Sequence, residues 1–151
     1  MRLSIMIVAL AAPAASALAQ PLPSWRTAAP TAGIWSYRET VTGSEAIFTD
    51  ARVTRRLVVK CSRMTRRVSL SVASAVPGNS IQVSTTETDR VLPAAFDAQG
   101  FQITSELGAQ DPILDSIVFS RGRFAVTVAG GAALVLPAWP EIARSIEDCR
   151  L

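Results

Sequence analysis

The chain has 151 residues, with 15 basic and 12 acidic side chains, two cysteines and no histidine. Without histidine, a Ser-His-Asp arrangement and the usual general base are excluded, and zinc has no cluster of cysteine and histidine ligands to occupy. The net charge of +3 is too small to steer partners by itself, so the positions of the arginines matter more than their number.

The first 19 residues have the features of a cleaved signal peptide. Arg2 gives a positive start, residues 3–12 are apolar, and Ala17 and Ala19 are small residues at the positions that a signal peptidase reads. The apolar run is too short for an uncleaved membrane anchor, because a bilayer needs about 20 apolar residues. We therefore expect cleavage after Ala19, a periplasmic or secreted location, and no transmembrane segment in the mature chain.

The mature chain has the length of one domain. Removal of 19 of the 151 residues leaves 132, enough to bury roughly two thirds of the unfolded chain's surface. Residues 20–32 are rich in proline and alanine and are expected to form a flexible leader. Residues 33–151 are expected to form a single β-rich domain.

Alternating apolar and polar residues predict a series of short strands. In residues 33–39, Trp35 and Tyr37 share one side. They indicate either a half-buried strand face, which is the commoner arrangement, or a pair that stacks on carbohydrate. Further short strands are expected at residues 81–85 and 101–104, with turn residues between them.

The clearest alternation in the first half predicts an antiparallel hairpin. One side of its first strand is apolar but is interrupted by Arg55, and the other side is polar. The apolar side consists of Val53, Leu57, Val59 and Cys61, and the polar side of Arg52, Thr54, Arg56 and Lys60. The pattern resumes after a short turn with Val68, Leu70 and Val72.

The C-terminal part predicts a helix, a hairpin and a closing helix. Asp111 is a favourable cap with Pro112 in the first helical position, Gly130 marks the hairpin turn, and Pro140 opens the last helix. The predicted fold is mainly β: an antiparallel β-sandwich or partly open barrel with two short helices packed on it, giving an α+β arrangement at the C-terminal end.

Cys61 and Cys149 are expected to form a single disulfide, since two cysteines in an exported chain usually pair. The chain-entropy model assigns a loop of this length about 4 to 5 kcal/mol. A free catalytic thiol is the alternative, but no histidine is present to activate it.

Other candidate catalytic groups are scattered. Lys60 has no Ser-x-x-Lys spacing, Glu87 and Asp89 could touch a cation, and Asp111 and Asp115 could pair one helical turn apart. A turn, a cap and an exposed helix position explain these carboxylates equally well. No Gly-rich phosphate loop or nucleophile elbow is present. We therefore predict no enzymatic activity, metal or cofactor, and we keep a carboxylate-based hydrolase as a third hypothesis.

Basic residues gather on the predicted hairpin. Four are expected on one outer face and two at the nearby turn, and we call the six the predicted basic face: Arg52, Arg56, Lys60, Arg63, Arg66 and Arg67. Such a face can bind lipid phosphates, a polyanionic envelope polymer or an acidic protein surface. The commoner alternative is a solvated face whose arginines deter edge-to-edge aggregation. Nucleic acid is not expected, because no aromatic residues interleave the arginines.

The sequence from Leu114 through SRGRFAV to LVLPAWPEIARSIEDCR is similar to a group of small uncharacterised secreted bacterial proteins. The order of strands, a helix, a hairpin and a last helix ending near a cysteine resembles the invasion-associated locus B family of periplasmic proteins. This resemblance implies a disulfide-containing β-sandwich without a known enzymatic site.

Together these features predict a non-catalytic, envelope-associated domain that binds an anionic partner through the predicted basic face. The partner would be an anionic envelope component or an acidic protein. The alternative is a structural or protein-interaction module that uses an aromatic surface near Trp35, Tyr37 and Trp139, with no role for the arginines.

Overall fold

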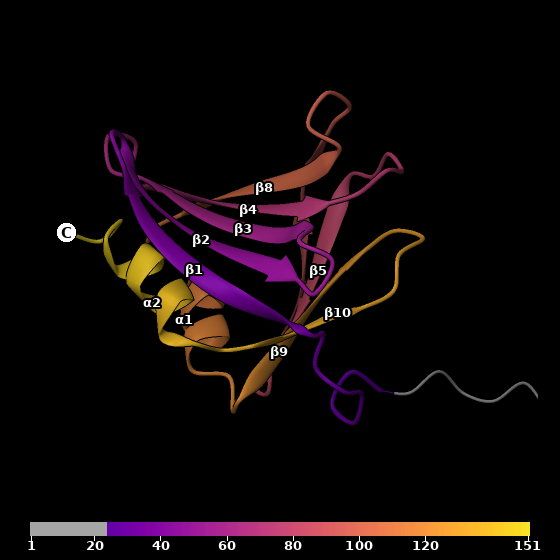
Figure 1. The fold of residues 1–151 in the computed structure, drawn as a ribbon. Helices are drawn as coiled ribbons and strands as arrows, with labels where there is room; N and C mark the ends of the chain where they lie inside the picture. The colour runs from indigo at the N-terminus through magenta and orange to yellow at the C-terminus, as the bar shows by residue number, and fades with distance from the viewer. Residues whose placement is uncertain (1–23) are drawn as a thin grey trace, which may run out of the picture.

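The computed structural model in Figure 1 describes residues 24–151. The predicted signal peptide and its cleavage site after Ala19 lie outside the described residues. The described chain is mainly β, with two antiparallel sheets and two short helices near the C-terminus. The predicted fold class is confirmed, in the form of a sandwich that does not close into a barrel.

Each sheet is antiparallel throughout. The first sheet has, in spatial order, β1 (Gly33–Thr40), β2 (Gly43–Asp50), β3 (Arg55–Ser62), β4 (Arg67–Ala73), β8 (Gln102–Gly108) and β7 (Ala95–Asp97). The second sheet has β10 (Leu134–Pro137), β9 (Arg123–Val128), β5 (Ser80–Ser84) and β6 (Asp89–Pro93).

The two sheets are joined along both sides. On one side the chain passes from β6 into β7 through Ala94, whose N–H donates to the Asn79 carbonyl at 2.9 Å. On the other side the segment around the start of β1 reaches β10. There the Thr31 N–H donates to the Val135 carbonyl at 2.8 Å, and the Trp35 indole N–H donates to the Pro137 carbonyl at 2.9 Å. The sandwich is therefore held by hydrogen bonds as well as by its core.

The apolar side chains of both sheets fill the space between them, as the alternation predicts. The buried members of the predicted hairpin are Leu57, Val59, Cys61, Val68, Leu70 and Val72. They face buried side chains of the second sheet, among them Ile81, Val83, Phe124, Val126 and Leu136. Val53 departs from the prediction, because it lies exposed in the turn before β3 and is not part of the core.

Two helices lie together near one end of the sandwich (Figure 1). Helix α1 (Pro112–Val118) begins as predicted, with the Asp111 carboxylate accepting the Ile113 N–H at 3.0 Å. Helix α2 (Pro140–Glu147) packs against β1, β2 and β3, and its buried Ser145 hydroxyl donates to the Val59 carbonyl at 3.1 Å. In residues 24–151 no helix combines the length and apolarity needed to cross a bilayer.

A disulfide fixes this helical end. Cys61 at the end of β3 and Cys149 just after α2 are bonded, with their Cα atoms 5.4 Å apart, and both are buried. The predicted pairing is confirmed. Beside the bridge, the Arg66 guanidinium donates to the main-chain oxygens of Arg150 and Leu151, so the last residues are tied to the β3–β4 turn.

The described part of the predicted leader, residues 24–32, is anchored rather than free. The Arg26 guanidinium donates to the Thr85 carbonyl at 3.3 Å, and the Arg123 guanidinium donates to the Ala28 carbonyl at 2.9 Å. With the bond from Thr31, these contacts hold the segment along the second sheet.

We expect loss of the disulfide to lower the free energy of unfolding by up to about 4 to 5 kcal/mol, because the unfolded chain regains the entropy of a long closed loop. Urea unfolding of the oxidised protein, the reduced protein and the variant Cys61→Ala/Cys149→Ala measures this loss. The reductant should have no effect on the double variant, which serves as the control. Coincident curves for the oxidised and reduced protein would show that the bridge adds no stability.

Candidate functional site

The predicted basic face does not form one continuous surface. Lys60 lies along β3, while Arg63, Arg66 and Arg67 lie at the β3–β4 turn beside the helical end. The other two members, Arg52 and Arg56, lie at the opposite end of β3. Six residues at about 3.3 Å each separate Arg56 from the last residue of β3, so roughly 20 Å lies between the two groups.

Partners within the chain neutralise the group at the β3–β4 turn. Arg63 lies 3.9 Å from the Asp148 carboxylate, and Arg67 lies 3.7 Å from the Glu106 carboxylate. Lys60 stands opposite Glu45 in the strand register, and Glu45 also pairs with Arg38. On the outer face of the first sheet, positive and negative side chains therefore stand side by side at this end.

A β-bulge changes the direction of Arg56. The register runs from Phe48 opposite Leu57 to Thr49 opposite Arg55, so Arg56 is the extra residue on β3. Such a bulge shifts the alternation by one residue. Arg55 therefore lies on the outer face, where it lines a hollow with Phe101, and Arg56 lines the gap between the sheets. The predicted position of Arg56 on the outer face is wrong for this reason.

Asp50 organises the turn that leads into the bulge. Its carboxylate accepts the N–H groups of Arg52 and Thr54, each at 2.9 Å, and the Arg56 guanidinium at 3.2 Å. The hydrogen bond from Thr54, together with those from Arg52 and Arg56, holds the pKa of Asp50 below its ordinary value of 3.8. Asp50 therefore fixes the backbone at Arg52 and holds the guanidinium group of Arg56.

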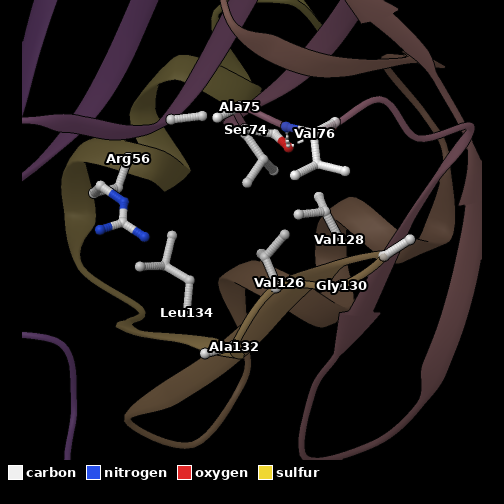
Figure 2. A pocket seen from close by; sticks show the side chains of 13 residues that line it. Arg56, Ser74, Ala75, Val76, Val126, Val128, Gly130, Ala132 and Leu134 are labelled. Carbon is white, nitrogen blue, oxygen red and sulfur yellow. Dashed lines mark hydrogen bonds between the residues drawn. The ribbon is translucent and has the colours of Figure 1, made fainter.

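A cavity of about 230 Å³ opens between the sheets beside Arg56 (Figure 2). Its walls are mostly apolar, with Val76 from the β4–β5 loop on one side and Val126 and Leu134 from the second sheet on the other. Arg56 is the single charged residue among those that line it. A second hollow of about 260 Å³, lined by Asp50 and Arg52 among others, shares Arg56 as a wall. We call this region, away from the helices, the open end of the sandwich.

The aromatic residues of the alternative hypothesis lie elsewhere and are mostly covered. Trp35 is buried with its ring edge-on to Phe48, the ring centroids 5.4 Å apart. The Tyr37 hydroxyl donates to Asp148 at 2.6 Å, and the Arg144 guanidinium lies 4.1 Å above the Tyr37 ring. These contacts hold α2 against β1.

Two of the carboxylates considered in the sequence analysis are engaged in ion pairs, whereas Glu87 and Asp89 form none among residues 24–151. Asp111 caps α1 and pairs with Arg90, and Asp115 pairs with Arg150. No group of three or more acidic or cysteine side chains that could hold a metal ion occurs among residues 24–151.

Comparison of the chain with protein-family models, curated proteins and solved structures gave no match. The resemblance to the invasion-associated locus B family therefore stays a prediction.

We expect the protein to lose stability in acid. Burial by itself would raise the pKa of Asp148, but the Tyr37 hydroxyl and neighbouring charges bring it below the ordinary value of 3.8, and the pKa of Asp50 is lowered as well. Groups with a lowered folded-state pKa stabilise fully above their unfolded-state pKa, and this stabilisation is lost as the pH falls through the folded-state pKa. The melting temperature should therefore fall below about pH 4.

Asp148→Asn tests this origin of the acid sensitivity. The variant should be less stable than the wild type at pH 7 and should lose less of its melting temperature on acidification. Thermal unfolding from neutral to acidic pH measures both slopes, and Glu147→Gln, an exposed neighbour on the same helix, is the control. An unchanged acid slope in Asp148→Asn would contradict the assignment.

Proposed function

We propose that this chain is an exported, non-catalytic domain that binds an anionic partner at the open end of its sandwich. The observation that carries this proposal is the gathering of three arginines there, beside an apolar cavity with Arg56 in its wall. We call Arg52, Arg55 and Arg56 the open-end arginines.

The free charge at the open end supports this proposal. Arg52 and Arg55 form no ion pair with a carboxylate of the described chain. Arg56 donates to Asp50 through one nitrogen only, which leaves most of its five N–H donors for a ligand. Guanidinium groups match phosphate, sulfate and carboxylate oxygens in a bidentate way, so this cluster suits an anionic group.

The proposed site contains two of the six residues of the predicted basic face, Arg52 and Arg56. Arg63, Arg66 and Arg67 have partners in the chain, and Lys60 stands beside Glu45. These four residues therefore offer less to an outside anion than Arg52 and Arg55, which form no ion pair among residues 24–151. Arg55, which interrupted the alternation, joins the proposed site in their place.

One observation supports an exported location, and a second argues against the aromatic interaction surface. The buried Cys61–Cys149 disulfide and the predicted signal peptide fit an exported, envelope-associated protein. Of the three aromatic residues of the alternative surface, only Trp139 is exposed. An interaction surface built on all three is therefore less well supported than the open-end arginines.

We expect Arg52→Ser/Arg55→Ser to weaken binding of the mature protein to heparin, used as a soluble sulfated polyanion, on the order of tenfold at low salt. Two unpartnered guanidinium groups are lost, and the remaining binding should fade with added salt. Titration in buffers of low and high ionic strength measures the affinity, and thermal unfolding shows whether each variant folds.

The matched control is Lys60→Ser/Arg67→Ser, which removes the same charge from the outer face of the first sheet. Nearly unchanged binding is expected for it, because Arg67 lies beside the Glu106 carboxylate and Lys60 stands opposite Glu45, so each positive charge has a negative one next to it. Equal losses in both variants would locate the effect in net charge and overturn the proposed site. Failure of the wild type to bind heparin at low salt would overturn anion binding itself.

A further inference from the structure

Four loops lie at the open end of the sandwich, on the side away from α1 and α2 (Figure 1): residues 51–54, 74–79, 98–101 and 129–133. The Ser74 N–H donates to the Phe101 carbonyl at 2.8 Å, which joins the second and third loops. Val76 and Gly130 line the same cavity, which places the fourth loop opposite the second. Arg55, directly after the first loop, lines a hollow with Phe101. These loops form one surface, which we call the loop rim.

The loop rim is apolar and has no acidic residue. Its sequences are ARVT, SAVPGN, AQGF and AGGAA. Three large apolar side chains in it are exposed to solvent: Val53 at 83%, Phe101 at 63% and Val76 at 57%. The open-end arginines lie within the first loop or directly after it. Asp50 and Asp97 directly precede the first and third loops, and both carboxylates accept hydrogen bonds from within the chain. Exposed apolar side chains beside cations are the composition of a surface that enters a lipid interface.

Two of these side chains are presented at strained positions. Val53 has φ of 62° and Phe101 has φ of 49°, in the left-handed region that disfavours branched and bulky residues. Glycine or asparagine would occupy either position with less strain. At both positions a small polar residue would reduce the backbone strain and the apolar surface exposed to water. The presence of valine and phenylalanine there points to a binding role for these side chains.

We propose that the loop rim docks on a lipid bilayer with anionic headgroups. This inference rests on the proposed anion binding and names its partner. The open-end arginines contact lipid phosphates, while Val53, Val76 and Phe101 enter the boundary between headgroups and acyl chains. Positive charge and apolar area act together, so neutral bilayers bind more weakly than anionic ones and salt removes only part of the affinity.

The helical end of the first sheet also exposes apolar side chains and can be compared with the loop rim. Val41 and Met64 are also highly exposed there, next to Arg63 and Arg66. Those two arginines are already engaged, by Asp148 and by the main-chain oxygens of Arg150 and Leu151. That end therefore has exposed apolar side chains without free guanidinium groups.

The first experiment is co-sedimentation of the mature protein with vesicles of phosphatidylglycerol and phosphatidylcholine in equal parts, and with vesicles of phosphatidylcholine alone. Val53→Asn/Phe101→Asn should lower partitioning onto the mixed vesicles at least about tenfold, because two large apolar side chains no longer leave water. Asparagine tolerates positive φ, so the variant should fold. Val41→Asn/Met64→Asn is the matched control and should bind like the wild type.

A second measurement identifies the residues that enter the lipid. Tryptophan introduced by Phe101→Trp should be quenched by vesicles made with brominated phospholipids, and tryptophan introduced by Met64→Trp should not. Each signal is compared with that of the wild type, which carries three tryptophans of its own.

The outcomes separate the inference from the function on which it rests. Binding to mixed vesicles that is lost in Val53→Asn/Phe101→Asn, with quenching in Phe101→Trp, supports the docking surface. Binding to heparin without binding to vesicles leaves anion binding standing and overturns the bilayer as partner. Quenching confined to Met64→Trp, or equal loss in both asparagine variants, also overturns it. Binding to neither probe overturns both proposals.

Discussion

The attachment of helix α2 to the first sheet makes the two ends of this sandwich different from each other. The Cys61–Cys149 disulfide and the hydrogen bond from Tyr37 to Asp148 hold the helix against β1, β2 and β3, and α1 lies beside it. Apolar side chains therefore fill that end, and its arginines are used in internal pairs. The cavity lies at the other end, together with Arg52 and Arg55, which form no ion pair among residues 24–151. The proposed binding site is therefore at the end away from the helices.

Most of the framework could be predicted from local patterns. Alternation in β3 and β4, the Asp111 cap, the glycine turn of the β9–β10 hairpin and the pairing of two cysteines each depend on neighbouring residues or on composition. Trp35 and Tyr37 were also correctly placed on one strand face. Their partners, Pro137 and Asp148, lie more than 100 positions away, and no periodicity in one strand predicts them.

The candidate site could be predicted only in part, because one inserted residue changes it. Arg55 interrupted an apolar row in the sequence, and that interruption was the only local signal of the bulge. A strict period of two placed Arg56 outside and left Arg55 unexplained. The loop rim had no sequence signal either, since its four segments come together only through the pairing of strands from both sheets.

The joined sides of the sandwich have a consequence for how copies of the chain meet one another. An edge strand normally offers a row of unsatisfied N–H and C=O groups to any extended segment nearby. Here the edge strands of one sheet adjoin those of the other, through Ala94 on one side and through Thr31 and Trp35 on the other. The carbonyls of Val135 and Pro137 on β10 are therefore occupied from within the chain, and fewer backbone groups are left for strand addition.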